Sequence, residues 1–273
     1  PRLLSNMNAV VDFTSLTQIF PLEEGVSMKG ELNSVLKVNI LLSDIKSANY
    51  GRMDIRGGCR LKDVVLKSER DSFLFRSKSI GLGFGTNMKD DTIWQGKNLL
   101  NGIFGFDSVD INMKERLVFH MDTSYVHVKT SPLRDTTAVA SMSANIRFGR
   151  IRLTVDDTLS LMMGNSKAKL SLGPSPSDKK VPQAKASVEM DSLRIRALGN
   201  RLRMEKAGFD LTSVMNKDDK RIWKTSGIIG FRNLGVYTPV FPLRMRMPAT
   251  KITLAPGRIE LNGAKLRIGH SDV

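Results

Sequence analysis

The stretch that decides the fold is IRFGRIRL at residues 146–153, in which Ile146, Phe148, Ile151 and Leu153 are apolar. Apolar residues at the first, third, sixth and eighth positions recur about every 42 residues, so the chain carries an internal repeat. Further copies begin at Cys59, Phe104, Val188 and Ile229, and a second series begins at Phe73, Phe119, Leu161, Leu202 and Met245.

Alternation at period two predicts a β-strand with one apolar face. The extra residue in the middle of each copy shifts the phase once, and a β-bulge or bend must absorb that shift. The slipped positions are polar or glycine: Lys62-Asp63, Gly149-Arg150, Asp191-Ser192, Glu205-Lys206 and Arg232-Asn233. A bend explains them best, because turn residues already separate the copies at Ser68–Asp71, Asp156-Asp157, Gly199-Asn200 and Thr238-Pro239. The alternative is a tight turn at some slips, most plausibly at Asn262-Gly263.

We therefore predict an all-β fold: an elongated antiparallel sheet of repeated bent hairpins that curls into a groove, with one or two short helices. The expected paired arms are 146–155 with 159–172, 186–197 with 201–211, and 228–237 with 241–254. Residues 1–25 are expected to form a lead-in with a short helix, and residues 26–273 the hairpin segment. The helix candidates are Thr14–Phe20, capped by Asp12 or Thr14 and stopped by Pro21, and more weakly Thr212–Asn216.

The length of 273 residues allows one or two compact domains, but the repeat favours one elongated body. Pro1 cannot be a translation start, so we expect the chain to be part of a longer one. No stretch approaches the roughly 18 apolar residues of a membrane helix, and no signal peptide opens the chain. The single cysteine, Cys59, lies at an apolar position of the repeat and is expected to be a packed side chain.

The inward positions of the predicted sheet offer two interpretations. They form an open groove that accepts acyl chains, or the sheet folds over on itself and they form a closed core. The residues expected to line a lipid groove are Phe84, Phe106, Ile146, Phe148, Ile151, Leu153, Leu193, Ile195, Leu202, Met204, Phe231, Leu243, Met245, Met247, Ile252 and Leu254.

The outward positions are strongly basic. The chain has 42 Lys and Arg against 27 Asp and Glu, a net charge of +15. These charges either keep a large sheet soluble or attract phosphate groups. The residues expected to contact anionic head groups are Arg194, Arg196, Arg201, Arg203, Arg244 and Arg246.

No pattern predicts catalysis, a metal site or a cofactor. Gly269–Asp272 begins like a nucleophile elbow but lacks the closing glycine. His120 and His127 stand too far apart on one arm to share a metal ion, and we expect both to point outward. Residues Gly81–Gly85 lack the Lys-Ser/Thr ending of a phosphate loop, so we attribute these glycines to close backbone packing. The aspartate pairs at 90–91, 156–157 and 218–219 are interpreted as turn formers.

Several segments resemble one protein family. The bent-hairpin repeat, residues Trp223–Gly227 leading into Gly230-Phe231, the segment Pro239–Leu243 and the closing Leu266–Asp272 are similar to AsmA-like proteins of Gram-negative bacteria, particularly their Bacteroidetes branch. The resemblance covers most of the chain from about Val26 onward. It implies a periplasmic body, tethered to the inner membrane by an N-terminal helix and built as a β-groove of the bridge-like lipid-transfer type.

We therefore expect a non-enzymatic envelope protein that binds or conducts phospholipid or another acylated lipid between membranes, in outer-membrane biogenesis or maintenance. Its membrane association would come from segments outside this chain. The alternative is a polyanion-binding, adhesive or structural β module that uses its basic outer face. Nucleic acid is not an expected partner, because aromatic residues make up only 6% of the chain and do not alternate with the basic ones.

Overall fold

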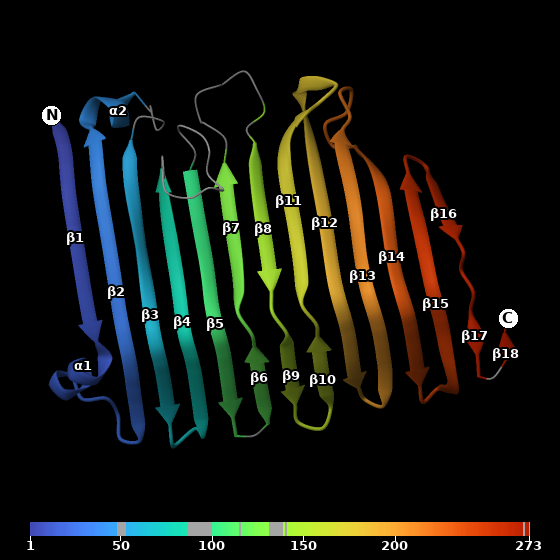
Figure 1. Ribbon diagram of the computed structural model, residues 1–273, viewed down its shortest axis with the longest axis horizontal. Coiled ribbons are helices and arrows are strands. Elements are labelled where there is room, and N and C mark those ends of the chain that lie inside the picture. The colour runs from blue at the N-terminus through green and yellow to red at the C-terminus, as the bar shows by residue number, and fades with distance from the viewer. Residues whose placement is uncertain are drawn as a thin grey trace.

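A computed structural model describes residues 1–47, 53–86, 100–114, 116–130, 139, 141–269 and 271–272. They form one antiparallel sheet of 18 strands with two short helices at strand ends (Figure 1). The elements are β1 (Arg2–Asp12), α1 (Phe13–Ile19), β2 (Val26–Leu41), α2 (Leu42–Lys46), β3 (Asp54–Ser68), β4 (Phe73–Thr86), β5 (Leu100–Met113), β6 (Leu117–Met121), β7 (Ser124–Thr130), β8 (Met142–Phe148), β9 (Ile151–Val155), β10 (Leu159–Met163), β11 (Ser166–Ser175), β12 (Asp178–Ala197), β13 (Asn200–Met215), β14 (Trp223–Thr238), β15 (Phe241–Ala255), β16 (Arg258–Asn262), β17 (Arg267–Ile268) and β18 (Ser271–Asp272).

The strands lie side by side in chain order, as consecutive hairpins require (Figure 1). The predicted arms are confirmed: β8 and β9 form the first, β10 and β11 the second, and β12 to β15 the remaining four. The paired arms β12 and β13 keep one register throughout, with Val188 opposite Phe209 and Ile195 opposite Leu202. The predicted all-β sheet of repeated hairpins is therefore correct.

Four long strands, β3, β12, β13 and β14, leave the ladder at the predicted slips. In β12 and β13, Met190 pairs with Ala207 and Ser192 with Glu205, while the residues between them are left out of the ladder. The backbone is left-handed at the slips of β3, β13 and β14, where φ is 48° at Asp63, 49° at Lys206 and 49° at Asn233. Non-glycine residues adopt this conformation rarely, and it turns the strand so that the apolar set returns to the same face.

The lead-in differs from the expectation. Strand β1 runs from Arg2 to Asp12 and pairs with β2 over its whole length, so the sheet begins well before residue 26. Helix α1 is confirmed, and Asp12 is its cap, since its carboxylate accepts hydrogen bonds from the backbone N–H of Thr14 at 2.7 Å and Ser15 at 3.1 Å. The prediction of a helix near residue 212 is wrong, because that segment belongs to β13, and α2 was not predicted.

Within the described chain, no helix has the length and apolar character that crossing a membrane requires.

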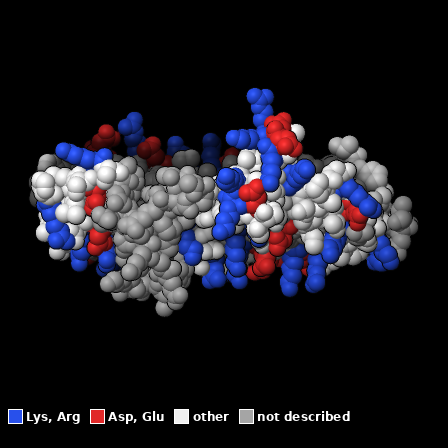
Figure 2. All heavy atoms as spheres, turned by 90° about the horizontal axis from the view of Figure 1, so that it is seen from above, with Lys and Arg blue, Asp and Glu red and all other residues white. Residues whose placement is uncertain are grey.

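The sheet is a single layer. Its accessible surface is 18417 Å² for a chain of 30.3 kDa, where a compact protein of that mass exposes about 12,000 Å². Extensive contacts among the described elements join only neighbouring strands, and the helices with the strands beside them. Viewed from the strand ends, the molecule is long and thin (Figure 2). The described strands therefore do not fold over into a closed core, and no described strand or helix packs across either face of the sheet.

Candidate functional site

One face of the sheet carries apolar residues in rows that cross it from edge to edge. We call it the apolar face. In the half of the sheet that contains β6, β9 and β10, which we call the part below the bends, each residue of one row pairs directly with the next. Every residue in this row is apolar. This lower row is Met28, Leu66, Phe75, Ile111, Phe119, Leu153, Leu161, Ile195, Leu202, Val236, Met245 and Ile268.

Above the bends, a second row is also apolar at every position and alternates large with small side chains across most of the sheet. This upper row is Met7, Leu36, Gly57, Phe84, Gly102, Val128, Ala144, Leu170, Ala186, Leu211, Gly227, Leu254 and Ile259. The Phe84 ring lies over Gly57, where an added Cβ would come within 2.6 Å of its Cζ. At about 4.8 Å between strands, such a row spans about 58 Å.

The structure brings the predicted groove-lining residues together. Six lie in the upper and lower rows, nine lie in parallel rows beside them, and Leu243 lies one step beyond Met245 on the same strand. The large side chains stay partly exposed: Phe84 by 38%, Leu170 by 41% and Phe104 by 42%. The face is therefore a continuous apolar surface that no other described element covers.

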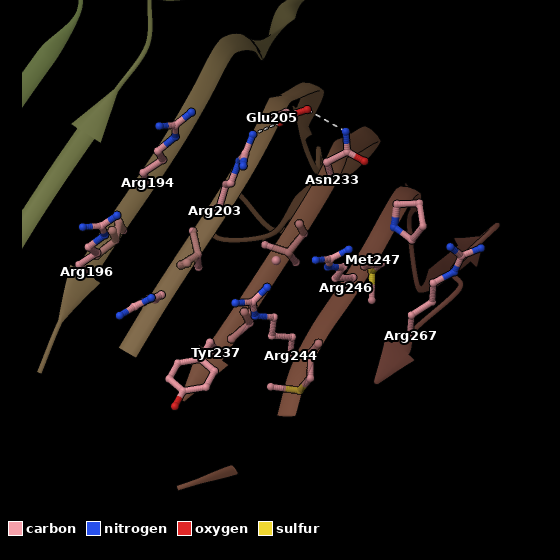
Figure 3. Close-up of a pocket in the computed structure, with 18 residues that line it drawn as sticks. Arg194, Arg196, Arg203, Glu205, Asn233, Tyr237, Arg244, Arg246, Met247 and Arg267 are labelled. Carbon is pink, nitrogen blue, oxygen red and sulfur yellow. Dashed lines mark hydrogen bonds and ion pairs between the residues drawn. The ribbon is translucent and has the colours of Figure 1, made fainter. Parts of the chain in front are cut away.

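The predicted arginines lie on the opposite face, which we call the basic face. All six line a hollow of about 880 Å³ over β12 to β15, together with Arg267 and Tyr237 (Figure 3). Consecutive side chains of a strand point to opposite faces, so the apolar residues between the arginines contribute through their backbone. The lining favours the arginine set: it includes Arg203 and Glu205 but omits Met204 between them, although Ile195, Leu202 and Met245 of the lower row also border the hollow. Lys and Arg project from both margins of the slab in Figure 2.

Like charges face each other in this arginine hollow. Arg194 pairs directly with Arg203, and Arg196 with Arg201, an arrangement that destabilises a sheet. Glu205 is the one acidic residue among the described residues that line it. Its carboxylate accepts hydrogen bonds from Asn233 Nδ2 at 2.7 Å and Arg203 at 2.6 Å, and these bonds lower the pKa of Glu205.

Sequence reasoning missed Arg267, Tyr237 and Gly235 as parts of this hollow. Arg267 comes from β17, whose register places it opposite Arg246. The Tyr237 ring lies 5.9 Å from the Arg201 guanidinium carbon, and Gly235 leaves the floor open between Arg203 and Arg246. The alternation along β14 places Gly235 and Tyr237 on the arginine side, but only the pairing of distant strands shows what they face.

The two histidines behave differently. His120 lies on β6 between two carboxylates, with Nδ1 2.6 Å from Asp110 and Nε2 3.1 Å from Asp122. The hydrogen bond to Asp110 is the main cause that raises the pKa of His120. Alternation with Val128 of the upper row places His127 on the outward face, as expected, but it is buried there at 5% exposure with Nε2 3.3 Å from Asn101 Oδ1. The described residues contain no cluster of three or more potential metal ligands.

The glycine run 81–85 and two of the aspartate pairs lie among the described residues. Gly81 and Gly83 do not serve close backbone packing, because an added Cβ at either position would meet nothing within 4 Å. The pairs at 156–157 and 218–219 lie in turns, as interpreted, whereas 90–91 and His270 lie outside the described residues.

No protein-family model, curated protein or solved structure matches the chain.

Proposed function

We propose that the protein binds lipid acyl chains on its apolar face and holds or conducts them along the sheet between membranes. The observation that carries the proposal is the lower row, which runs from β2 to β17 and in which every member is apolar. A surface of this kind needs a cover, since single soluble proteins rarely expose apolar patches of more than a few hundred Å².

Acyl chains suit this surface chemically. Each methylene removed from water contributes about 0.8 kcal/mol, and the contact needs no hydrogen-bonding partner. Rows running across the strands offer the same surface at each step along the sheet, which favours movement over fixed binding. The resemblance to AsmA-like proteins supports the same function and adds a periplasmic location, an inner-membrane tether and a role in outer-membrane biogenesis as parts of this proposal.

The location of the arginines changes one detail of the expectation. A lipid whose chains lie on the apolar face cannot place its head group in the arginine hollow, because the sheet separates the two. The proposed lipid instead extends its head group past the strand ends into water.

The test combines lipid occupancy with folding. Lipids are extracted from the purified protein and identified by mass spectrometry, and thermal unfolding is measured on the same samples. Replacing Met204 or Phe231 by Glu should abolish occupancy while the sheet still folds, because a charge on an open face stays hydrated. Arg203→Glu is the matched control, since it places the same charge beside Met204 on the opposite face.

Two results would contradict the proposal. One is a purified protein that carries no lipid and does not acquire fluorescent phosphatidylethanolamine from vesicles. The other is unchanged lipid occupancy in Met204→Glu and Phe231→Glu proteins that remain folded.

A further inference from the structure

We propose that the arginine hollow is a binding site for an anion with two or more phosphate groups, distinct from the lipid on the apolar face. The hollow is a bounded space. Gly235 leaves its centre open, since an added Cβ there would meet only the Arg203 carbonyl oxygen, 4.0 Å away. Tyr237 stands toward the strand ends, and the hydrogen-bonded Glu205 and Asn233 stand toward the bends (Figure 3).

The hollow concentrates charge of one sign, since seven arginines and a single glutamate line it among the described residues. Farther along the same row, the acidic Asp110 lies between Arg76 and His120. In the hollow the row instead places Arg194 opposite Arg203. Solubility requires net charge but not this concentration of one sign. An anion bound between the guanidinium groups would relieve the repulsion.

The side chains point to phosphate. Every basic residue lining the hollow is arginine, and the guanidinium group is a planar fork that binds phosphate through two parallel hydrogen bonds. The arginines are exposed to solvent, so a ligand can reach them without rearrangement of the sheet.

The size of the hollow points to more than one phosphate. Arg194 on β12 and Arg246 on β15 are three strand spacings apart, which is about 14 Å. Seven arginines line the hollow, whereas one phosphate group carries only about two negative charges. A chain of phosphates, or a head group with several, can contact both ends.

The site does not depend on the proposed lipid function. Its ligand approaches the basic face, while acyl chains occupy the apolar face. The two proposals can therefore fail separately. A protein that binds no phosphate but keeps its lipid contradicts only this site, and a protein that carries no lipid but binds phosphate contradicts only the lipid function.

The experiment is isothermal titration calorimetry, which measures the dissociation constants of tripolyphosphate and of orthophosphate at one fixed ionic strength. Tripolyphosphate should bind at least about tenfold more tightly, because it engages several charged hydrogen-bond donors at once. The variant Arg201→Gln/Arg203→Gln should weaken its binding about tenfold or more, and Arg201→Lys/Arg203→Lys should also weaken it because lysine lacks the fork. Gly235→Leu should block binding by filling the hollow.

The matched control is Lys167→Gln/Lys169→Gln, which removes the same charge from exposed positions of β11 on the basic face. If the control weakens tripolyphosphate binding as much as the arginine variant does, the effect is one of general charge and the proposal is overturned. Equal affinity for tripolyphosphate and orthophosphate would overturn it as well. Melting temperatures check that each variant folds. If a variant fails to fold, the proposal is still tested by whether the wild-type protein binds tripolyphosphate more tightly than orthophosphate.

A second experiment identifies the source of the phosphate. Vesicles of phosphatidylcholine with or without phosphatidylinositol bisphosphate are tested for co-sedimentation with the protein. Binding to the bisphosphate vesicles that Arg201→Gln/Arg203→Gln abolishes assigns the site to a membrane head group. Tripolyphosphate binding without vesicle binding assigns it to a soluble polyphosphate, and binding to neither refutes the site.

Discussion

Replacing Leu170 by Glu distinguishes an open lipid-binding face from a closed core. Leu170 lies in the upper row between Ala144 and Ala186 and is 41% exposed, so somewhat more than half of its side chain is covered. Complete burial of a leucine contributes about 1.5–3 kcal/mol, and losing about half of that costs about 1–2 kcal/mol. In a closed core, truncation alone would cost about 2–5 kcal/mol.

The assay is thermal unfolding followed by circular dichroism, together with native mass spectrometry of bound lipid. For a protein of this length we expect the melting temperature to fall by only about 2–8 °C. We expect lipid occupancy to fall strongly, because acyl chains that cross this row would meet a carboxylate. The control is Lys169→Glu, which places the same side chain next along β11 on the opposite face.

Two outcomes would refute the reasoning. An unfolded Leu170→Glu protein, with the Lys169→Glu protein intact, would show that Leu170 is a core residue. Equal lipid occupancy in both variants would show that the lipid does not lie on the apolar face.

Two further predictions concern the fold. Because the pKa of His120 is raised in the folded state by Asp110, its stabilising contribution is complete below the ordinary histidine pKa of about 6.5 and is lost as pH rises through the raised value. Urea unfolding from pH 5 to 9 should show this loss, and His120→Gln should remove it; an unchanged pH profile would refute the assignment. Gly227→Ala should destabilise the protein by about 1–3 kcal/mol, because φ is 147° there and the new Cβ would strike the backbone carbonyl of Asp210. Gly81→Ala, with open space around it, should be neutral or stabilise by up to about 1 kcal/mol, and equal losses at both glycines would contradict this explanation.

The lead-in and the second helix candidate show where sequence reasoning failed. Strand β1 has no regular alternation, since Leu3 and Leu4 are adjacent and both exposed at the edge of the sheet. Its pairing with β2 could not be predicted from period two. At Thr212–Asn216 the local helix signal was overridden by pairing of β13 with both of its neighbours.

The sequence by itself determined the repeat, the bent arms and the division of residues between two faces. Those properties are local, because alternation at period two and a single slip are enough to specify them. It also placed six arginines on one face. The tertiary structure decided how far each row continues and what lies beside each arginine, because both depend on the register between strands that are distant in sequence. That register aligned twelve apolar residues into the lower row, and brought Arg267 and Tyr237 to the hollow.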